Sequence, residues 1–293
     1  MNLQRNRFIP VTLLLGVTIV WGSAFAIMKD TLDRQDVNSF LACRFIIAAG
    51  IMLLLRPQCL KHMNKDFLIR GVATGTFLGT GYIFQTFGLT MTTVAKTGFL
   101  TGLYAVIVPL IAAGFFKAKV RKLQWIAVTL ALIGMAILSL KGFSVGLGEF
   151  LVFLSAVMFA FHIVALGKWS PGRDPYALTL IQMVTVGVIC FIGSLKSGFH
   201  MPPDQGAWVA IVYTAIFASA IAFIVQTWAQ SFMSATSVGI ILTMEYIFAA
   251  AFGIVLVHES LTIRTIIGGL FVMGGLYLAI WAEEPQKTGK IAS

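Results

Sequence analysis

A single carboxylate lies deep in a long apolar stretch near the end of the chain. Glu245 is flanked by LTM and by YIFAAAFG, well inside a predicted membrane span at about 236–257. A carboxylate in a membrane costs roughly 2.5–3.5 kcal/mol on insertion scales, so a compensating interaction is expected. Glu245 could bind an amine or another cation, or it could take up a proton. The alternative is a structural glutamate that is hydrogen-bonded to a neighbouring helix.

Two other polar side chains are interpreted as structural. Arg44 lies inside a predicted span at about 37–55, with its Cα about 10 Å below the nearer surface at 1.5 Å per residue. Its head could reach outward or form an ion pair within the bundle, with Glu245 as a possible partner. We expect the ion pair. Gln182 occupies the position that corresponds to Arg44 in a second set of spans and is also expected to be structural.

Two glutamines occupy matching positions in a sequence repeat. The segment IFQT at 83–86 recurs as IVQT at 224–227, and this offset aligns Gln85 with Gln226. Amides inside a membrane either bond across helices or face an aqueous cavity. Both glutamines are therefore candidates for a central binding site, with an architectural hydrogen bond as the open alternative.

Aromatic side chains near these positions could stack against a flat or cationic ligand. The alternative is helix packing or an interfacial belt, since the chain has 24 phenylalanines. His162 can titrate near neutral pH, but a lone histidine on an apolar face is more often a packing residue. The aromatic candidates are Trp21, Tyr104, Trp228 and Tyr246.

The composition is that of a protein whose surface faces lipid. Hydrophobic residues make up 58% of the 293 residues, charged residues only 11%, and the mean hydropathy is +0.92. The net charge of +10 comes from residues in short loops, which indicates membrane topology rather than nucleic-acid binding. Three widely spaced cysteines offer neither a disulfide framework nor a metal site. No Walker A, HExxH, CxxC or GxSxG motif is present, so we expect no enzyme, cofactor or bound metal.

Ten apolar segments are long enough to be predicted as spans, since about 20 residues cross the hydrocarbon core. The first segment exceeds the length of a signal-peptide core, so we expect it to be retained. The fold class is therefore an all-α membrane protein. The segments lie at about 8–28, 37–55, 68–90, 94–116, 123–140, 147–166, 176–194, 207–229, 236–257 and 262–282.

The repeat divides these spans into two sets of five. Residues 1–141 are predicted to form the first five-helix unit, and residues 142–293 the second unit with a short polar tail. Because five is odd, the second unit enters the membrane from the opposite side, which makes the two units inverted repeats. Such pairs commonly hold a substrate site near the midplane between them.

The distribution of positive charge predicts the orientation. With a cytoplasmic N-terminus, fourteen lysines and arginines lie inside and six outside. Because cytoplasmic loops carry the excess of positive charge, both termini are expected in the cytoplasm. The predicted location is a bacterial inner membrane.

With the repeat established, the chain resembles a known family. Trp21-Gly22-Ser23 and Arg44 in LACRFIIAAG are similar to the first-repeat markers of the EamA family, within the drug/metabolite transporter superfamily. The stretches FQTFGLTMTT and TGLYAVIVPL resemble the third and fourth helices of that family, and LTMEYIFAAAFGIVLVHESL resembles its ninth. The resemblance implies ten helices, a cavity between two halves, and alternating access for small metabolites, commonly outward. The family often has proline after the ninth-helix glutamate, where this chain has Tyr246.

Glycine and proline predict how the helices pack and bend. Gly71, Gly75 and Gly79 form a small-residue stripe that permits close approach of another helix. Pro109 is expected to interrupt the fourth span.

Together these features predict a secondary transporter, most simply an exporter of small metabolites such as amino acids or amphipathic compounds. We expect the site near Gln85, Gln226 and Glu245, with proton antiport through Glu245 or facilitated export as open alternatives. The expected partners are a small-molecule substrate and the lipid bilayer, not nucleic acid, in a monomer or homodimer. The alternatives are a nucleotide-sugar or phosphate-ester carrier, which needs several cavity cations, and a receptor or assembly protein without flux. A membrane enzyme would need a catalytic constellation that the sequence lacks.

Overall fold

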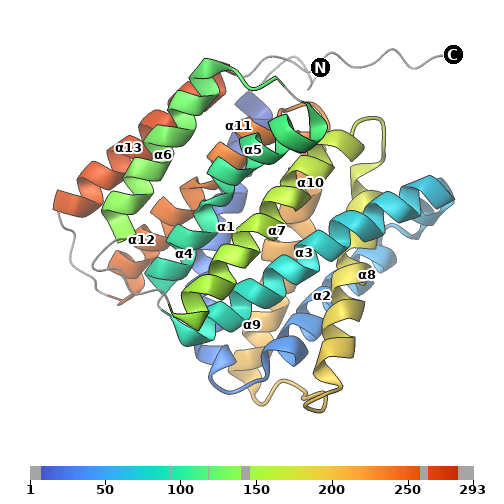
Figure 1. The fold of residues 1–293 in the computed structure, drawn as a ribbon. Coiled ribbons are helices and arrows are strands. Elements are labelled where there is room, and N and C mark those ends of the chain that lie inside the picture. Colours follow the sequence, from blue (N-terminus) through green and yellow to red (C-terminus); the bar gives the residue numbers. More distant parts are fainter. Residues whose placement is uncertain (1–7, 93, 118, 140–145, 258–262, 283–293) are drawn as a thin grey trace, which may run out of the picture.

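The computed structural model describes residues 8–282, apart from residues 93, 118, 140–145 and 258–262. All regular secondary structure in these residues is helical (Figure 1). The elements are α1 (Phe8–Leu32), α2 (Val37–Leu55), the 3₁₀ helix η2 (Pro57–His62), α3 (Lys65–Met91), α4 (Val94–Gly102), α5 (Tyr104–Phe116), α6 (Lys122–Ser139), α7 (Leu147–Trp169), α8 (Pro175–Ser194), α9 (Gln205–Ala215), the π-helix η3 (Ile216–Ile221), α10 (Ala222–Gln230), α11 (Ala235–Leu242), α12 (Met244–Val257) and α13 (Ile263–Ala282).

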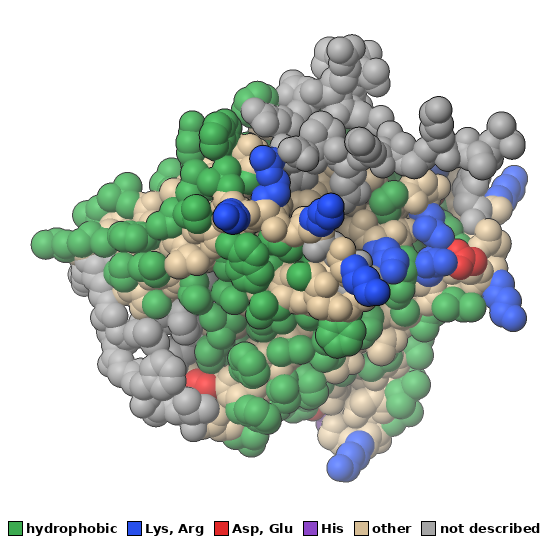
Figure 2. All heavy atoms as spheres, turned by 45° about the horizontal axis from the view of Figure 1, so that its top comes forward, with side chains coloured by type: hydrophobic (Ala, Val, Ile, Leu, Met, Phe, Trp, Pro, Cys, Tyr) green, Lys and Arg blue, Asp and Glu red, His purple; other side chains and the backbone are tan. Residues whose placement is uncertain are grey.

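These helices match the ten predicted spans. Three of the spans consist of more than one helix: α4 with α5, α9 with η3 and α10, and α11 with α12. Five of the described helical runs are by themselves long and apolar enough to cross a membrane. The surface agrees with a membrane setting, since large apolar side chains such as Leu54, Phe115 and Tyr277 are mostly exposed and hydrophobic atoms cover much of the face in Figure 2. The all-helical membrane fold is thus confirmed.

Several helices begin at a polar connection that caps them. The side chains of Asp36, Asn64, Asp204 and Ser234 each accept a hydrogen bond from the backbone N–H three residues later. Such caps satisfy one of the free amides of a helix N-terminus. The short polar connections therefore determine where these apolar helices start.

The helices of the two halves pack against each other rather than forming separate bundles. Helix α3 lies along α7 and α8, α2 along α8, α1 along α12, and α6 along α13 (Figure 1). A Cβ added to Gly134 of α6 would lie 2.5 Å from the carbonyl oxygen of Gly268, and one added to Gly275 of α13 would lie 2.7 Å from that of Ala127. The offset that relates Gln85 to Gln226 also relates Gly134 to Gly275, so the contact is reciprocal, as related halves require.

The glycine stripe of α3 is used for the predicted close packing. A Cβ added at Gly71 would lie 2.6 Å from Ile181, and one added at Gly75 would lie 2.7 Å from Thr185. Both contacts are on α8, which a bulkier residue would push away. The stripe therefore joins a helix of the first half to one of the second.

The fourth and ninth spans are both interrupted at equivalent places. The fourth breaks at Leu103, between α4 and α5, and the ninth breaks at Thr243, between α11 and α12. Pro109 lies inside α5, so the interruption precedes the proline instead of coinciding with it. At Thr243 the side-chain hydroxyl donates to the Ile240 carbonyl over 2.6 Å, and the break needs no proline.

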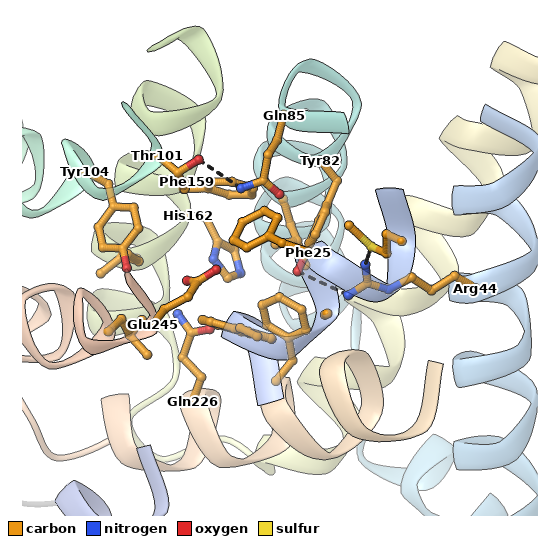
Figure 3. Close-up of a pocket in the computed structure, with 17 residues that line it drawn as sticks. Phe25, Arg44, Tyr82, Gln85, Thr101, Tyr104, Phe159, His162, Gln226 and Glu245 are labelled. Atoms are coloured by element: carbon orange, nitrogen blue, oxygen red, sulfur yellow. Dashed lines mark hydrogen bonds between the residues drawn. The ribbon is translucent and has the colours of Figure 1, made fainter. Parts of the chain in front are cut away.

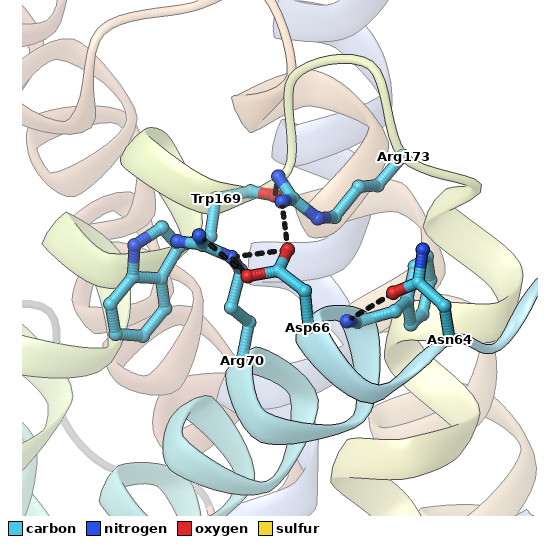
Figure 4. A network of polar contacts seen from close by, with 6 residues as sticks. Asn64, Asp66, Arg70, Trp169 and Arg173 are labelled. Atoms are coloured by element: carbon cyan, nitrogen blue, oxygen red, sulfur yellow. Dashed lines mark hydrogen bonds and ion pairs between the residues drawn. The ribbon is translucent and has the colours of Figure 1, made fainter.

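Ion pairs join the halves at both ends of the bundle. At the end formed by the α2–α3 and α7–α8 connections, Asp66 accepts hydrogen bonds from Arg70 and from Arg173 (Figure 4). At the opposite end Arg34 pairs with Asp204. Both sets lie in connections or near the ends of helices, where water can reach them.

Candidate functional site

A cavity lies between the halves, in the interior of the bundle. The space in it that is open to the centre of a water molecule is about 50 Å³, enough for a few waters. Its wall includes residues from both halves. Five of the residues predicted from the sequence line it: Trp21, Gln85, Tyr104, Gln226 and Glu245.

Each residue of the Trp21-Gly22-Ser23 motif has a separate structural role. The Trp21 Nε1–H donates to the Ala218 carbonyl over 2.9 Å, and Ser23 shares a 2.7 Å hydrogen bond with the Tyr213 hydroxyl. A Cβ on Gly22 would lie 2.9 Å from the Glu245 carbonyl oxygen. The motif thus holds α1 against the eighth span and against α12, with Glu245 at the second crossing.

Glu245 lies in the first turn of α12, directly after the break at Thr243. Its carboxylate points into the cavity beside Tyr104, His162 and Gln226 (Figure 3). The hydrogen bonds and ion pairs of the described residues include none to this carboxylate. A half-buried, unpartnered carboxylate is available to a ligand or a proton.

Tyr104 is the counterpart of Glu245 in the first half. It begins α5 directly after the break at Leu103, and the offset of the repeat aligns it with Glu245. Both side chains line the cavity. The two interrupted spans therefore bring equivalent positions to the same site, one with a hydroxyl and one with a carboxylate.

The two repeated glutamines also reach the cavity but bond differently. The Gln85 amide donates to the Thr101 hydroxyl over 3.0 Å. The Gln226 amide donates to Gln230 Oε1 over 3.1 Å, and Gln230 donates in turn to the Ile163 carbonyl over 2.6 Å. Gln226 Oε1 is buried and has no partner among the described residues.

Arg44 also lines the cavity, where it forms no ion pair with any described residue. The residue is 1% exposed, and its guanidinium donates to Ser219 Oγ over 2.8 Å and to the Ala218 carbonyl over 3.2 Å. It also contacts Met28 Sδ and the Tyr82 hydroxyl. Among the described residues no carboxylate pairs with Arg44, so the expected ion pair is absent and neutral groups take its place.

The π-helix η3 supplies two of those groups. Ala218 and Ser219 both lie in it, and the Ala218 carbonyl accepts from Trp21 and from Arg44. A π-turn shifts the backbone bonding pattern of a helix and is often found at functional sites. Here it anchors α1 and α2 to the middle of the eighth span.

The sequence favours a packing role for His162, yet this residue lines the cavity. Its Nε2 lies 2.7 Å from Gln182 Oε1. Gln182, predicted to be structural, thus holds a cavity residue in place. The sequence offered no way to find this pair, because α7 and α8 are apolar around most of their circumference and no periodicity shows which side faces inward.

Two predicted binding residues lie outside the cavity. Trp228 packs edge-on against Phe232 with ring centroids 4.9 Å apart, and the Tyr246 ring fills the space above Gly98. Each step along a helix turns the side-chain direction by about 100°. Tyr246 therefore points about 100° away from Glu245, and Trp228, two positions on, points about 200° away from Gln226. The cavity wall contains other aromatics that the sequence did not single out: Phe25, Tyr82, Phe159 and Phe223.

No cluster of potential metal ligands occurs in the part of the chain that the structure describes. The cavity combines an unpartnered carboxylate, amides, a histidine and aromatic walls. Its polar groups suit binding of an organic molecule.

Comparison with known proteins agrees with this architecture. The EamA-like transporter family matches residues 8–140 and again residues 146–281. An uncharacterized transporter of Archaeoglobus fulgidus is 29% identical over 258 residues, covering 88% of this chain and 81% of that protein. The uncharacterized inner membrane transporter YedA of Escherichia coli is 28% identical over 71% of this chain and 70% of its own. A solved crystal structure superposes with a TM-score of 0.79 at 14% identity, covering 94% of this chain and 97% of the other. The chain belongs to the EamA-like transporter family.

Proposed function

We propose that the protein is a secondary transporter that exports small amphipathic metabolites, such as amino acids, by alternating access of its two halves. The observation that carries this proposal is the interior cavity with an unpartnered carboxylate between the halves. We place the boundary between the halves at residues 141 and 142, in a bacterial inner membrane with both termini in the cytoplasm.

The chemistry of the cavity supports an amphipathic substrate. Figure 3 shows Glu245 at one end and Arg44 at the other, with aromatic rings between them. The acid can attract a cationic group of the substrate. The rings of Phe25 and Phe223 can contact an apolar body.

The small size of the cavity supports alternating access. About 50 Å³ holds a few waters, so a metabolite needs the surrounding helices to move apart. The breaks at Leu103 and Thr243 provide places where helices that line the cavity can bend. In this proposal the halves move about the bound substrate, first on one side of the membrane and then on the other.

A proton is the coupling ion that the site supports best. Glu245 has no partner among the described residues, and protonation would remove the cost of its buried charge. With Glu245 protonated, the transporter could return without substrate to the side of the membrane where substrate binds. The protein would then exchange substrate for a proton.

The alternatives have less support. A nucleotide-sugar or phosphate-ester carrier needs several cations around its phosphates, and Arg44 is the lone arginine or lysine among the described residues that line the cavity. A receptor or assembly protein without flux would not need a cavity at the interface of two repeats.

Counterflow in proteoliposomes tests the proposal. Liposomes loaded with unlabelled amino acids are diluted into labelled ones, with Glu245→Gln as the matched variant. Saturable uptake by the wild type that is lost in the variant is expected. Uptake equal in both would remove Glu245 from the mechanism, and absence of uptake for every compound would contradict transport of this class.

A further inference from the structure

Three side chains from three helices meet at the Glu245 end of the cavity: His162 from α7, Gln226 from α10 and Glu245 itself from α12 (Figure 3). A carboxylate can only accept hydrogen bonds, whereas an amide and a neutral imidazole can both donate and accept. The hydrogen-bond partners of the Gln226 amide and of the His162 imidazole show which atom of each group donates and which accepts.

The orientation of the Gln226 amide is set by a backbone carbonyl. The Ile163 carbonyl can only accept, so Gln230 must turn its NH₂ toward it. Gln230 Oε1 then faces Gln226 and accepts from its NH₂. Gln226 Oε1 is consequently turned the other way, buried and without a partner among the described residues.

The tautomer of His162 is set in the same manner. Gln182 donates its NH₂ to the Leu178 carbonyl over 3.2 Å, so its Oε1 faces His162 Nε2 at 2.7 Å. An amide oxygen only accepts, which requires a hydrogen on Nε2. In the neutral ring Nδ1 is then an acceptor, and none of the hydrogen bonds of the described residues involves it.

The groups without a hydrogen-bond partner at this end of the cavity are therefore all acceptors. Glu245, Gln226 Oε1 and His162 Nδ1 all accept, and each lacks a donor among the described residues. Gln226 Oε1 is buried as well as unpaired, which is unfavourable unless a ligand supplies a donor. A ligand that brings several N–H donors and a positive charge would meet all of them.

We propose that this end of the cavity recognises the N–H groups of a primary ammonium, with Glu245, Gln226 Oε1 and His162 Nδ1 as its acceptors. The inference rests on the proposed function and narrows it to substrates that carry a protonated primary amine. Gln182 and Gln230 are positioning residues, since they act by orienting His162 and Gln226. A quaternary ammonium has the same charge but no N–H, so it can satisfy none of these acceptors and is expected to bind more weakly. An aromatic cage around a carboxylate would instead accept both.

A binding measurement on the purified protein tests this without depending on transport. Labelled 2-phenylethylamine is the probe, and trimethyl(2-phenylethyl)ammonium and 2-phenylethanol are the competitors. We expect the quaternary compound to bind at least about tenfold more weakly than the primary amine, as loss of hydrogen bonds to a charged group implies. Equal binding of the two cations, or no binding of the amine, would overturn the inference.

Two variants test the assigned acceptors. His162→Gln keeps a donor for Gln182 at the place of Nε2 but removes the acceptor at Nδ1, and Gln226→Met removes the amide oxygen. Each is expected to weaken binding of the primary amine about tenfold. Gln35→Met is the matched control, because Gln35 Oε1 is also buried and unpartnered among the described residues but lies outside the cavity. Unchanged amine affinity in both cavity variants would refute the assignment.

Binding and transport separate the two proposals. If the primary amine binds selectively but no amine or amino acid crosses the membrane in counterflow, the inference stands and the transport function fails. If transport occurs and the quaternary compound competes as well as the primary amine, transport stands and the inference fails.

Discussion

Arg44 and Glu245 are both charged, both lie inside the bundle and both line the same cavity, yet the protein treats them differently. Arg44 makes four hydrogen bonds to neutral groups of α1, α3 and η3, and the Tyr82 ring lies 4.9 Å from its guanidinium carbon. Glu245 has no hydrogen-bond or ion-pair partner among the described residues. The fold supplies hydrogen-bond partners for the first charge and none, among the described residues, for the second, as the proposed binding role of Glu245 requires.

The difference separates stability from function. Removing Arg44 deprives several buried groups of their donor, whereas removing the charge of Glu245 deprives no described protein group of a partner. Burial of a charge is therefore a poor guide to its role, and its partners are a better one. The following predictions test this distinction, in order of decreasing effect.

The largest effect is expected for Glu245→Gln. Transport should fall by about a hundredfold, the scale of losing one partner of a buried charge interaction of about 2–3 kcal/mol. The melting temperature of the detergent-purified protein should stay the same or rise, because an uncompensated charge is removed. Counterflow and thermal unfolding measure the two quantities. A strong fall in melting temperature would assign Glu245 a structural role and undo the comparison.

Arg44→Met is expected to lower the free energy of unfolding by about 3 kcal/mol. It leaves the Ser219 hydroxyl without its donor and takes one donor from the Ala218 carbonyl, at about 1–3 kcal/mol for each unsatisfied group. Arg44→Lys should lie between wild type and Arg44→Met, since lysine keeps the charge but cannot reproduce the planar set of donors. Denaturant unfolding in detergent is the measurement. If Arg44→Met were as stable as wild type, the hydrogen bonds from Arg44 to these neutral groups would not contribute to stability.

Gly22→Ala tests how Glu245 is positioned. The new Cβ would lie 2.8 Å from the Ala249 nitrogen and 2.9 Å from the Glu245 carbonyl oxygen, so α1 and α12 must separate at a cost of about 1–3 kcal/mol. Gly16→Ala, in the same helix, is the control because a Cβ there meets nothing within 4 Å. Gly22→Ala should reduce both stability and transport, while Gly16→Ala should reduce neither. Similar results for the two variants would contradict the close crossing.

The smallest effect is expected for Asp66→Asn, which changes a charge outside the predicted span 68–90. Hydrogen bonds from Arg70 and Arg173 lower the pKa of Asp66 from 3.8 to about 2. Because the folded-state pKa is lowered, the stabilisation is present above pH 3.8 and is lost as the pH falls through about 2. Asp66 is exposed to water, so the decrease in melting temperature at neutral pH should be small.

Melting curves of Asp66→Asn and wild type between about pH 6 and pH 2 test this. The two melting temperatures should converge as the pH falls. A difference that grows with acidity would contradict the sign of the pKa shift.

The sequence predicted the fold closely because the membrane imposes simple requirements. Each span must be a helix of about 20 apolar residues, so ten apolar runs with short polar connections are enough to predict ten helical segments. The repeat also related Gln85 to Gln226, which both line the cavity. Polar groups within spans are costly, and for this reason Glu245 could be found without a structure.

Other residues of the cavity could not be found in this way. His162 and Tyr82 lie on helices without a marked polar face, so no pattern shows which residues face a cavity and which face lipid. A similar lack of pattern on α12 accounts for Tyr246. The sequence predicts that Tyr246 and Trp228 bind substrate, and both point elsewhere.

The sequence by itself determined which segments cross the membrane, how they repeat and which charges lie inside, because those follow from the cost of polar groups in lipid. The tertiary structure alone decided the partners of each charge. Ser219 and the Ala218 carbonyl are far from Arg44 along the chain and meet it because a π-turn presents them to α2. Glu245 lacks such partners among the described residues because the break at Thr243 turns it into the cavity.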